Sequence, residues 1–278
     1  MAIEFSAFLP LVLLMLAVGT GAGFLSGLLG VGGGFLLVPG LYYCFQQLGY
    51  QSDILMHFCI GTALAIIVPT VLSSARAHYK KHSVDFTVFK DWIFAMVFGV
   101  GCGVYLASLL SSTHLVLLFA VTAILTSAYM FSSKEKKETE HKLPKSKLKY
   151  ILASIIGMIT ALMGIGGAIV SVPVMSAFSV PIQRAIGTAA AMGVVTSFIG
   201  ACGYMVIGWH SDVALTPPFS VGYVNIIALA IVVPASALMA PVGAHCAHKM
   251  NPKLLKRIFA VLLALIAIKM LIQGGIFS

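Results

Sequence analysis

Long apolar runs separated by short polar segments follow one another along the chain. Runs of about 18 or more residues hold almost no charged side chain, and each is long enough to cross the hydrocarbon core of a bilayer as a helix. The predicted long spans cover residues 8–29, 54–76, 90–110, 114–131, 150–164, 186–208, 222–244 and 255–273. This pattern predicts an all-α polytopic membrane protein.

Two shorter apolar pieces each follow a cluster of glycines. Residues 30–34 read GVGGG and residues 164–168 read GIGGA, with Pro39 and Pro173 at the same distance behind them. The pieces themselves cover residues 33–46 and 167–180. At about 14 residues each, they reach only about 21 Å as helices, which is short of a full bilayer core. We therefore expect each half of the chain to begin with a helical hairpin that is broken by Gly and Pro and has a short second helix.

The two glycine clusters belong to an internal duplication. Gly61-Thr62 in the first half has its counterpart in Gly187-Thr188, at a similar separation from the cluster. The loop after the first Gly-Thr helix carries an arginine and several lysines, whereas its counterpart, residues 207–223, carries no Lys or Arg. Since basic residues favour cytoplasmic loops, the two halves are predicted to lie in opposite orientations.

Opposite orientations require an odd number of membrane crossings in each half. We predict two inverted-topology repeats of about five passes each, formed by residues 1–131 and 150–278, with both termini outside the cytoplasm. The segment 132–149 is rich in Lys and Glu, has no apolar periodicity, and is predicted to be a charged cytoplasmic linker. The N-terminal sequence MAIEFS lacks a basic n-region, so no cleavable signal peptide is expected.

Composition and charge narrow the function further. Of the 278 residues, 60% are hydrophobic and 9% are charged, far below the roughly 25% charged residues of a soluble domain. The net charge of +9 gathers in short loops between spans, which is the positive-inside pattern and not a nucleic-acid surface. The five cysteines form no CxxC pair, and the spans hold neither an acidic cluster nor an HExxH motif. We therefore expect no metal, no cofactor and no enzyme activity.

The paired glycine clusters are the predicted substrate site. Glycine lets the backbone turn and approach a ligand closely, and the amides that open a short helix form a partial positive charge suited to an anion. The predicted substrate-binding residues are Gly32, Gly33, Gly34, His57, Thr62, Gly166, Gly167, Ala168, Arg184 and Thr188, with Pro39 and Pro173 as gating or helix-shaping residues. His57 and His78 are the candidates for carrying a coupling proton. Ala168 stands where the first cluster has Gly34, so the two halves of the site are not equivalent.

Other interpretations of these and neighbouring residues stay open at this point. Gly19, Gly23 and Gly27 follow a small-xxx-small pattern, which is typical of ordinary helix packing. Arg184 either offers a bidentate fork to an anion or simply orients its helix from the cytoplasmic side. His78 also fits a histidine at the membrane interface, and Ser or Thr hydroxyls also bond to the carbonyls of their own helix.

Several of these stretches resemble one family of transporters. They are GLLGVGGGFLLVPGL (residues 27–41), HFCIGT (57–62), AHYKK (77–81), ALMGIGGAIVSVPV (161–174) and RAIGT (184–188). Together they resemble the sulfite exporter TauE/SafE family, also called the TSUP transporters. The resemblance implies a secondary transporter in the plasma membrane that moves small anions such as sulfite, sulfoacetate or another organosulfonate, and we expect an exporter.

A passive anion channel of the same architecture is the alternative to a secondary transporter. The partners implied by the resemblance are a small anionic substrate, the lipid bilayer, and a proton or a sodium ion as coupling ion. A homodimer is compatible with the sequence, and no nucleic-acid partner is expected.

Overall fold

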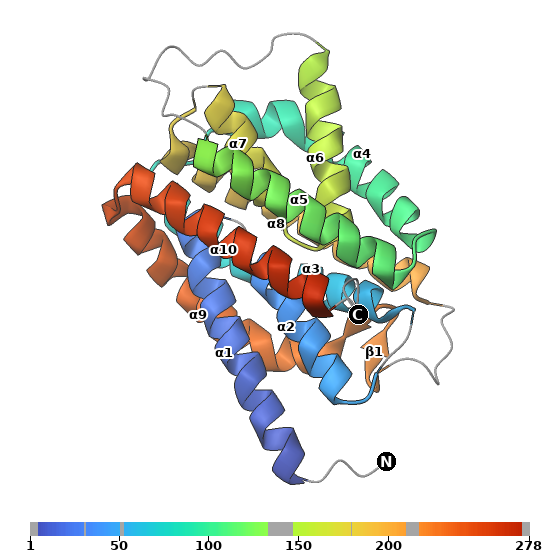
Figure 1. Ribbon diagram of the computed structural model, residues 1–278. Helices are drawn as coiled ribbons and strands as arrows, with labels where there is room; N and C mark the ends of the chain where they lie inside the picture. Colours follow the sequence, from blue (N-terminus) through green and yellow to red (C-terminus); the bar gives the residue numbers. More distant parts are fainter. Residues whose placement is uncertain are drawn as a thin grey trace.

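The chain forms a bundle of helices that cross one another at several angles (Figure 1). The computed structural model describes residues 5–30, 32–50, 53–132, 147–178, 180–209 and 217–273. Within these ranges the helices are α1 (Phe5–Leu29), α2 (Gly34–Gln47), α3 (Leu55–Tyr79), α4 (Phe86–Ser108), α5 (Ser112–Ser132), α6 (Leu148–Met163), α7 (Ala168–Ala177), α8 (Ile182–Ile207), α9 (Ile226–Lys249) and α10 (Pro252–Gln273). A short antiparallel hairpin, β1 (Ser220–Val221) and β2 (Val224–Asn225), precedes α9.

Six of the described helices are long and apolar enough to cross a membrane: α1, α3, α4, α5, α8 and α9. This confirms the prediction of a helical, polytopic membrane protein. The predicted spans at 150–164 and 255–273 correspond to α6 and α10, whose apolar stretches are shorter. The short pieces behind the glycine clusters correspond to α2 and α7.

The edges of several elements differ from the sequence prediction, and in two of them the structure shows the cause. The span expected from residue 222 begins only at Ile226, because the residues before it form the hairpin and Asn225 caps the helix. α7 holds 10 residues, fewer than expected, since the N–H of Phe178 turns back onto the carbonyls of Val174 and Met175. Residues 133–146, most of the predicted linker 132–149, lie outside the described residues, as do the termini at 1–4 and 274–278.

The largest helix contacts join the two halves of the chain. α1 packs against α9, α3 against α8, α4 against α6 and α5 against α10. Figure 1 shows α5 and α10 side by side along one face of the bundle. Each helix has an equivalent in the other half: α1 corresponds to α6, α2 to α7, and so on to α5 and α10. If every helix is replaced by its equivalent, the same set of contacting pairs results. The helix contacts therefore follow an approximate two-fold symmetry.

Three glycines on one face of α1 allow its backbone to approach α9. Gly19 lies against Val232, and a Cβ atom at Gly27 would overlap the carbonyl oxygen of Ala240. Gly23 lies between these contacts, against Ser236. The packing interpretation of this small-xxx-small pattern is therefore confirmed, and the order of the contacts shows that α1 and α9 run parallel.

The same kind of contact gives the directions of the other pairs. The matching contacts are Gly99 with Ser154 and Gly103 with Met158 on α4 and α6, and Gly193 with Val71 and Gly200 with Leu64 on α8 and α3. In the two contacts between α4 and α6 the residue numbers rise together along both helices, so α4 and α6 run parallel, as α1 and α9 do. In the two contacts between α8 and α3 the residue numbers rise along α8 and fall along α3. The two Gly-Thr helices are therefore antiparallel to each other.

We expect Gly27→Ala to destabilise the protein. The added methyl group would meet the backbone of α9 at Ala240 and Ala244, and overpacking of this kind costs about 1–3 kcal/mol. Thermal unfolding of the purified protein in detergent measures the effect. Gly101→Ala in α4 is the matched control, because a Cβ atom there meets nothing within 4 Å and alanine favours the helix. Equal melting of Gly27→Ala and wild type would contradict the close approach of α1 and α9.

Candidate functional site

Each glycine cluster forms a sharp break between a long helix and a short one. The glycines with positive φ in the two breaks are Gly30 (69°), Gly32 (74°), Gly33 (74°), Gly164 (67°), Gly166 (67°) and Gly167 (85°). Side chains with a Cβ atom rarely adopt these angles, so the geometry explains why glycine recurs at the same places. Gly33 and Gly167 are the N-cap residues of α2 and α7, and neither helix has a side-chain cap at this end.

The two breaks meet in the interior of the bundle. A Cβ atom at Gly34 would overlap the carbonyl oxygen of Gly164 and would lie 2.6 Å from the Cα atom of Ile165. Gly34, Gly164 and their neighbours Gly33 and Gly167 are all buried. The structure therefore brings together the two glycine clusters that the sequence singled out, and it packs them backbone against backbone.

Each break also rests on the Gly-Thr helix of the other half. A Cβ atom at Gly30 would lie 2.5 Å from the carbonyl oxygen of Ile186 in α8, and one at Gly164 would lie 3.1 Å from the Cα atom of Ile60 in α3. Ile60 and Ile186 directly precede the two Gly-Thr pairs. The duplicated motifs thus contact each other reciprocally, which explains why both are repeated in the sequence.

The threonines of the Gly-Thr pairs hold the starts of two other helices. Thr62 Oγ1 accepts a hydrogen bond from the backbone N–H of Asn225 at 2.9 Å, and Thr188 Oγ1 accepts one from the N–H of Asp85 at 2.9 Å. Asn225 and Asp85 are in turn the N-cap residues of α9 and α4, and the side chain of each accepts hydrogen bonds from the first turn of its helix. Both threonine hydroxyls, predicted to bind substrate, therefore have a structural partner in this conformation.

The glycines of the Gly-Thr pairs make room for the same two chain segments. A Cβ atom at Gly61 would overlap the carbonyl oxygen of Tyr223, and one at Gly187 would overlap that of Ser83. Tyr223 and Ser83 each stand two residues before the N-cap that the neighbouring threonine binds. Asp and Asn at the start of an apolar run are recognisable N-cap signals in a sequence, but their threonine partners are not.

The predicted proton carriers His57 and His78 lie near opposite ends of α3. His57 is 4% exposed; its Nε2 lies 2.9 Å from the carbonyl oxygen of Ala107, and its ring packs against Tyr223. Its Nδ1 is buried and has no hydrogen-bond partner among the described residues. At about 1.5 Å of rise per residue, about 30 Å of helix separates the two histidines, so they do not form one site.

His78 has a partner that the sequence did not indicate. Its Nε2 lies 2.9 Å from the carbonyl oxygen of Gly27, and its Nδ1 lies 3.1 Å from Nε2 of His248 in α9. Its side chain is fully buried near the end of α3, so the histidine packs inside the protein, and its place at the membrane interface stays a prediction. No spacing rule joins α3 to α9, because the pair depends on tertiary packing.

The remaining predicted site residues are Arg184, Pro39, Pro173 and Ala168. Arg184 is exposed in the first turn of α8, outside the buried contact between the breaks. Pro39 and Pro173 are buried within α2 and α7. Ala168, the first residue of α7, is fully buried beside the second break.

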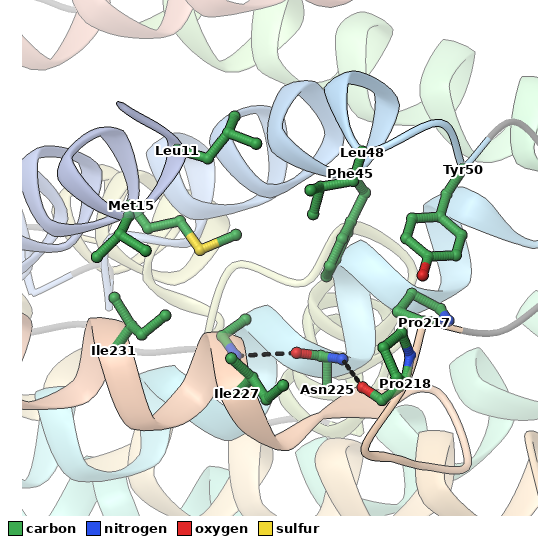
Figure 2. A pocket seen from close by; sticks show the side chains of 12 residues that line it. Leu11, Met15, Phe45, Leu48, Tyr50, Pro217, Pro218, Asn225, Ile227 and Ile231 are labelled. Carbon is green, nitrogen blue, oxygen red and sulfur yellow. Dashed lines mark hydrogen bonds between the residues drawn. The ribbon is translucent and has the colours of Figure 1, made fainter. Parts of the chain in front are cut away.

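A pocket lies elsewhere, between α1, the end of α2, the start of α9 and the segment before α9 (Figure 2). Its lining is mostly apolar, with side chains such as Leu11, Met15 and Phe45. The amide of Asn225 points into it but is already bonded, to the N–H of Ala228 and to the carbonyl oxygen of Pro218. With no charged side chain in its lining, this pocket suits an apolar group and not an anion.

A helical bundle that buries two broken helices against each other at its centre has the architecture of a membrane transporter. Residues 15–270 match the family described as "Sulfite exporter TauE/SafE", and the chain belongs to that family.

The chain is also similar along nearly its whole length to curated proteins from distant organisms. A "probable membrane transporter protein" of Haemophilus influenzae is 30% identical, and the alignment covers 94% of this chain and 98% of the relative. Relatives described in the same way are 27% identical in Methanocaldococcus jannaschii, over 95% of this chain and 97% of the relative, and in Bacillus subtilis, over 95% and 98%. No solved structure matches the chain. The protein is thus a multi-pass membrane transporter with a small-molecule substrate.

We expect Thr62→Val to destabilise the fold. Valine keeps the shape of threonine but leaves the buried N–H of Asn225 without an acceptor, at a cost of about 1–3 kcal/mol. Thermal unfolding measures the loss, and Thr62→Ser should restore most of it. Thr20→Val is the control, because the hydroxyl of Thr20 is exposed and bonds only within its own helix. Wild-type melting of Thr62→Val would mean that the threonine does not hold α9.

Proposed function

We propose that the protein is a secondary transporter that exports a small sulfur-containing anion, such as sulfite, sulfoacetate or another organosulfonate, across the plasma membrane. One observation carries the proposal: the two glycine breaks meet in the buried centre, where α2 and α7 both begin. The family description supports sulfite as the first substrate to test. A passive anion channel is the second candidate, because the same central contact would also serve as the gate of a channel.

The start of a short helix is a favourable place for an anion. The helix macrodipole gives its N-terminus a partial positive charge, and backbone N–H groups there point along the axis. Two such ends, from α2 and α7, lie on either side of the contact between Gly34 and Gly164. We propose that the substrate is held there by Gly32, Gly33 and Gly34 from one half and by Gly166, Gly167 and Ala168 from the other.

The described conformation is closed at this point, because the backbones of the two breaks touch. Substrate binding then requires the breaks to separate. The threonines Thr62 and Thr188 hold α9 and α4 in this state, and we propose that a change in those hydrogen bonds exposes their hydroxyls to substrate. Arg184, exposed at the start of α8, is proposed to attract anions to the entrance, and Pro39 and Pro173 to set the shape of the short helices.

We further propose that the halves are inverted repeats, residues 1–131 and 150–278, joined by the cytoplasmic linker 132–149. The antiparallel course of α3 and α8 and the parallel courses of α1 with α9 and α4 with α6 are what five passes in each half would produce. Both termini then lie outside the cytoplasm. Labelling of a single cysteine at residue 278, in a variant without its five natural cysteines, tests this: reaction only from the cytoplasmic side would refute the inverted arrangement.

A homodimer is proposed through the exposed face of α4. Phe94, Phe98 and Tyr105 are exposed at 84%, 69% and 69% and follow one another at helical spacing along that face. Such a face contacts either lipid or a second copy of the chain. Cross-linking of single cysteines placed at Phe98 in membranes distinguishes the two, because only a dimer gives cross-linked pairs.

Transport of sulfite by the protein in proteoliposomes tests the function. A secondary transporter should accumulate sulfite against its concentration gradient when a proton or sodium gradient is imposed, whereas a channel should only equalise the concentrations at zero membrane potential. The measurement is the sulfite content of the vesicles over time, with empty liposomes as the control. Absence of flux for sulfite, sulfoacetate and simple sulfonates would refute the proposed function.

Gly167→Ala should reduce transport while leaving the protein folded. A methyl group at Gly167 meets only side-chain atoms, at 3.1 Å from Thr160 Oγ1 and 3.4 Å from Met96 Cε. The positive φ of 85° strains the residue by about 1–2 kcal/mol. Gly33→Leu would be a poor test, because a Cβ atom there overlaps the backbone of Ala22 and would disturb folding.

Vesicle flux and thermal unfolding, measured on the same preparations, separate the two effects. Gly49→Ala is the control for backbone strain, since Gly49 has a φ of 86° and open space around it, outside the central contact. If Gly167→Ala and Gly49→Ala transport sulfite equally well, the second break is a packing device and the substrate binds elsewhere.

A further inference from the structure

His78 and His248 form a partly buried pair at the junction of three helices. His78 of α3 is fully buried, and His248 of α9 is partly exposed, so the pair connects the interior to the surface. The nitrogens that face each other are 3.1 Å apart, and the other nitrogen of His78 lies 2.9 Å from the carbonyl oxygen of Gly27 in α1. Gly27 stands three residues before the first glycine of the break, about 4.5 Å of helix rise away.

The carbonyl oxygen fixes the protons of the neutral pair. A carbonyl only accepts hydrogen bonds, so Nε2 of His78 carries a hydrogen and donates it to Gly27. In a neutral ring the other nitrogen, Nδ1, is then an acceptor. Nε2 of His248 must therefore carry a hydrogen and donate it to His78. The neutral pair has one arrangement of protons.

One additional proton fits into this arrangement, and a second does not. When His78 is protonated, its Nδ1–H donates to Nε2 of His248, which must be unprotonated. When His248 is protonated instead, the hydrogen bond keeps its original direction. If both rings were charged, two N–H groups would face each other at 3.1 Å. The pair is therefore built to share a single proton between its two rings.

Within the described part of the chain, no negative partner for that proton acts on the pair. The charged or titratable groups that act on it are Lys81, just after α3, and His245 of α9. α1 contributes the carbonyl of Gly27 and the uncharged Ser26, whose hydroxyl is buried and has no hydrogen-bond partner among the described residues. A positive charge away from water is costly without a counter-charge. An anion near the first break would supply one.

The second half of the chain lacks this chemistry at the matching place. Tyr204 follows Thr188 at the same distance as His78 follows Thr62. Its hydroxyl donates to the carbonyl oxygen of Ala161 at 3.0 Å, as His78 does to Gly27, and Ala161 also stands three residues before its break. The tyrosine makes the same structural hydrogen bond with no group that titrates near neutral pH. The histidine therefore adds something beyond packing.

We propose that His78 and His248 bind one proton between them and that this proton is the coupling ion of anion transport. That this proton is the coupling ion rests on the proposed function, whereas the sharing of one proton by the two histidines does not. Because proton and anion would stabilise each other, binding of either should raise the affinity for the other by the same factor. The pair thus makes the protein a proton-coupled anion transporter.

The shared proton is tested on the protein without substrate, by NMR of nitrogen-labelled histidine rings over a pH titration. We expect the neutral state to show a hydrogen on Nε2 of His78 and none on its Nδ1. Below the midpoint, the two rings together should gain one proton. A hydrogen on Nδ1 of neutral His78, or uptake of two protons by the pair, would overturn the shared site.

The coupling is tested with ethanesulfonate, an anion whose own charge does not change between about pH 5 and pH 8. For wild type we expect proton uptake on binding, and an affinity that falls by up to about tenfold per pH unit above the midpoint. His78→Gln leaves His248 as the one ring of the pair that can take the proton, so we expect less proton uptake on anion binding and a flatter pH profile than in wild type. Its amide donates to Gly27 and accepts from His248, as the neutral histidine does.

His114→Gln, an exposed histidine at the start of α5, is the matched control and should behave as wild type. A pH profile of His78→Gln that equals that of wild type would overturn the coupling. If wild type binds neither ethanesulfonate nor sulfite at any pH, the proposed function fails and the coupling fails with it. The titration of the empty protein still decides whether the pair shares a proton.

Discussion

Two backbone segments touch in the centre of this bundle, at Gly34 and Gly164, and the rest of the structure is arranged around that contact. Backbone that leaves a helix at membrane depth must be enclosed by protein or by a water-filled cavity, because lipid offers it no hydrogen bonds. The long helices α3 and α8 provide the enclosure, and α1 and α6 deliver the chain to it. Their close packing in turn requires the glycines that let α1 approach α9 and α4 approach α6.

The Gly-Thr motif connects this centre to the outer helices. On each side the isoleucine before the motif supports the break of the other half, and the glycine and threonine hold the start of α4 or α9. One helical turn therefore contacts both the candidate substrate site and the helices that surround it. A displacement of either break would act directly on a helix N-terminus, through a hydrogen bond of 2.9 Å at Thr62 or Thr188.

Much of this organisation follows from local patterns in the sequence. Apolar run length predicts the helices, and the repeated glycine clusters predict the breaks and their importance. What local patterns do not contain is the identity of partners across the fold: His78 and His248 are 170 residues apart, and nothing in either helix points to the other. The role of Thr62 as hydrogen-bond acceptor for the N–H of Asn225 was also missed. Asn225 lies at the end of a hairpin whose strands hold only two residues each, too few to be recognised in a sequence.

The pairing of α1 with α9 also has a consequence for how the protein is made. α1 is synthesised first, while its partner is the penultimate helix of the chain. Throughout most of translation, the glycine stripe of α1 must therefore face lipid or the insertion machinery in place of its final neighbour. Domains generally fold in the order of synthesis, but this bundle cannot assemble until α9 has entered the membrane. A ribosome that stalls before α9 would leave a chain whose first helix is already inserted and still without its main contact.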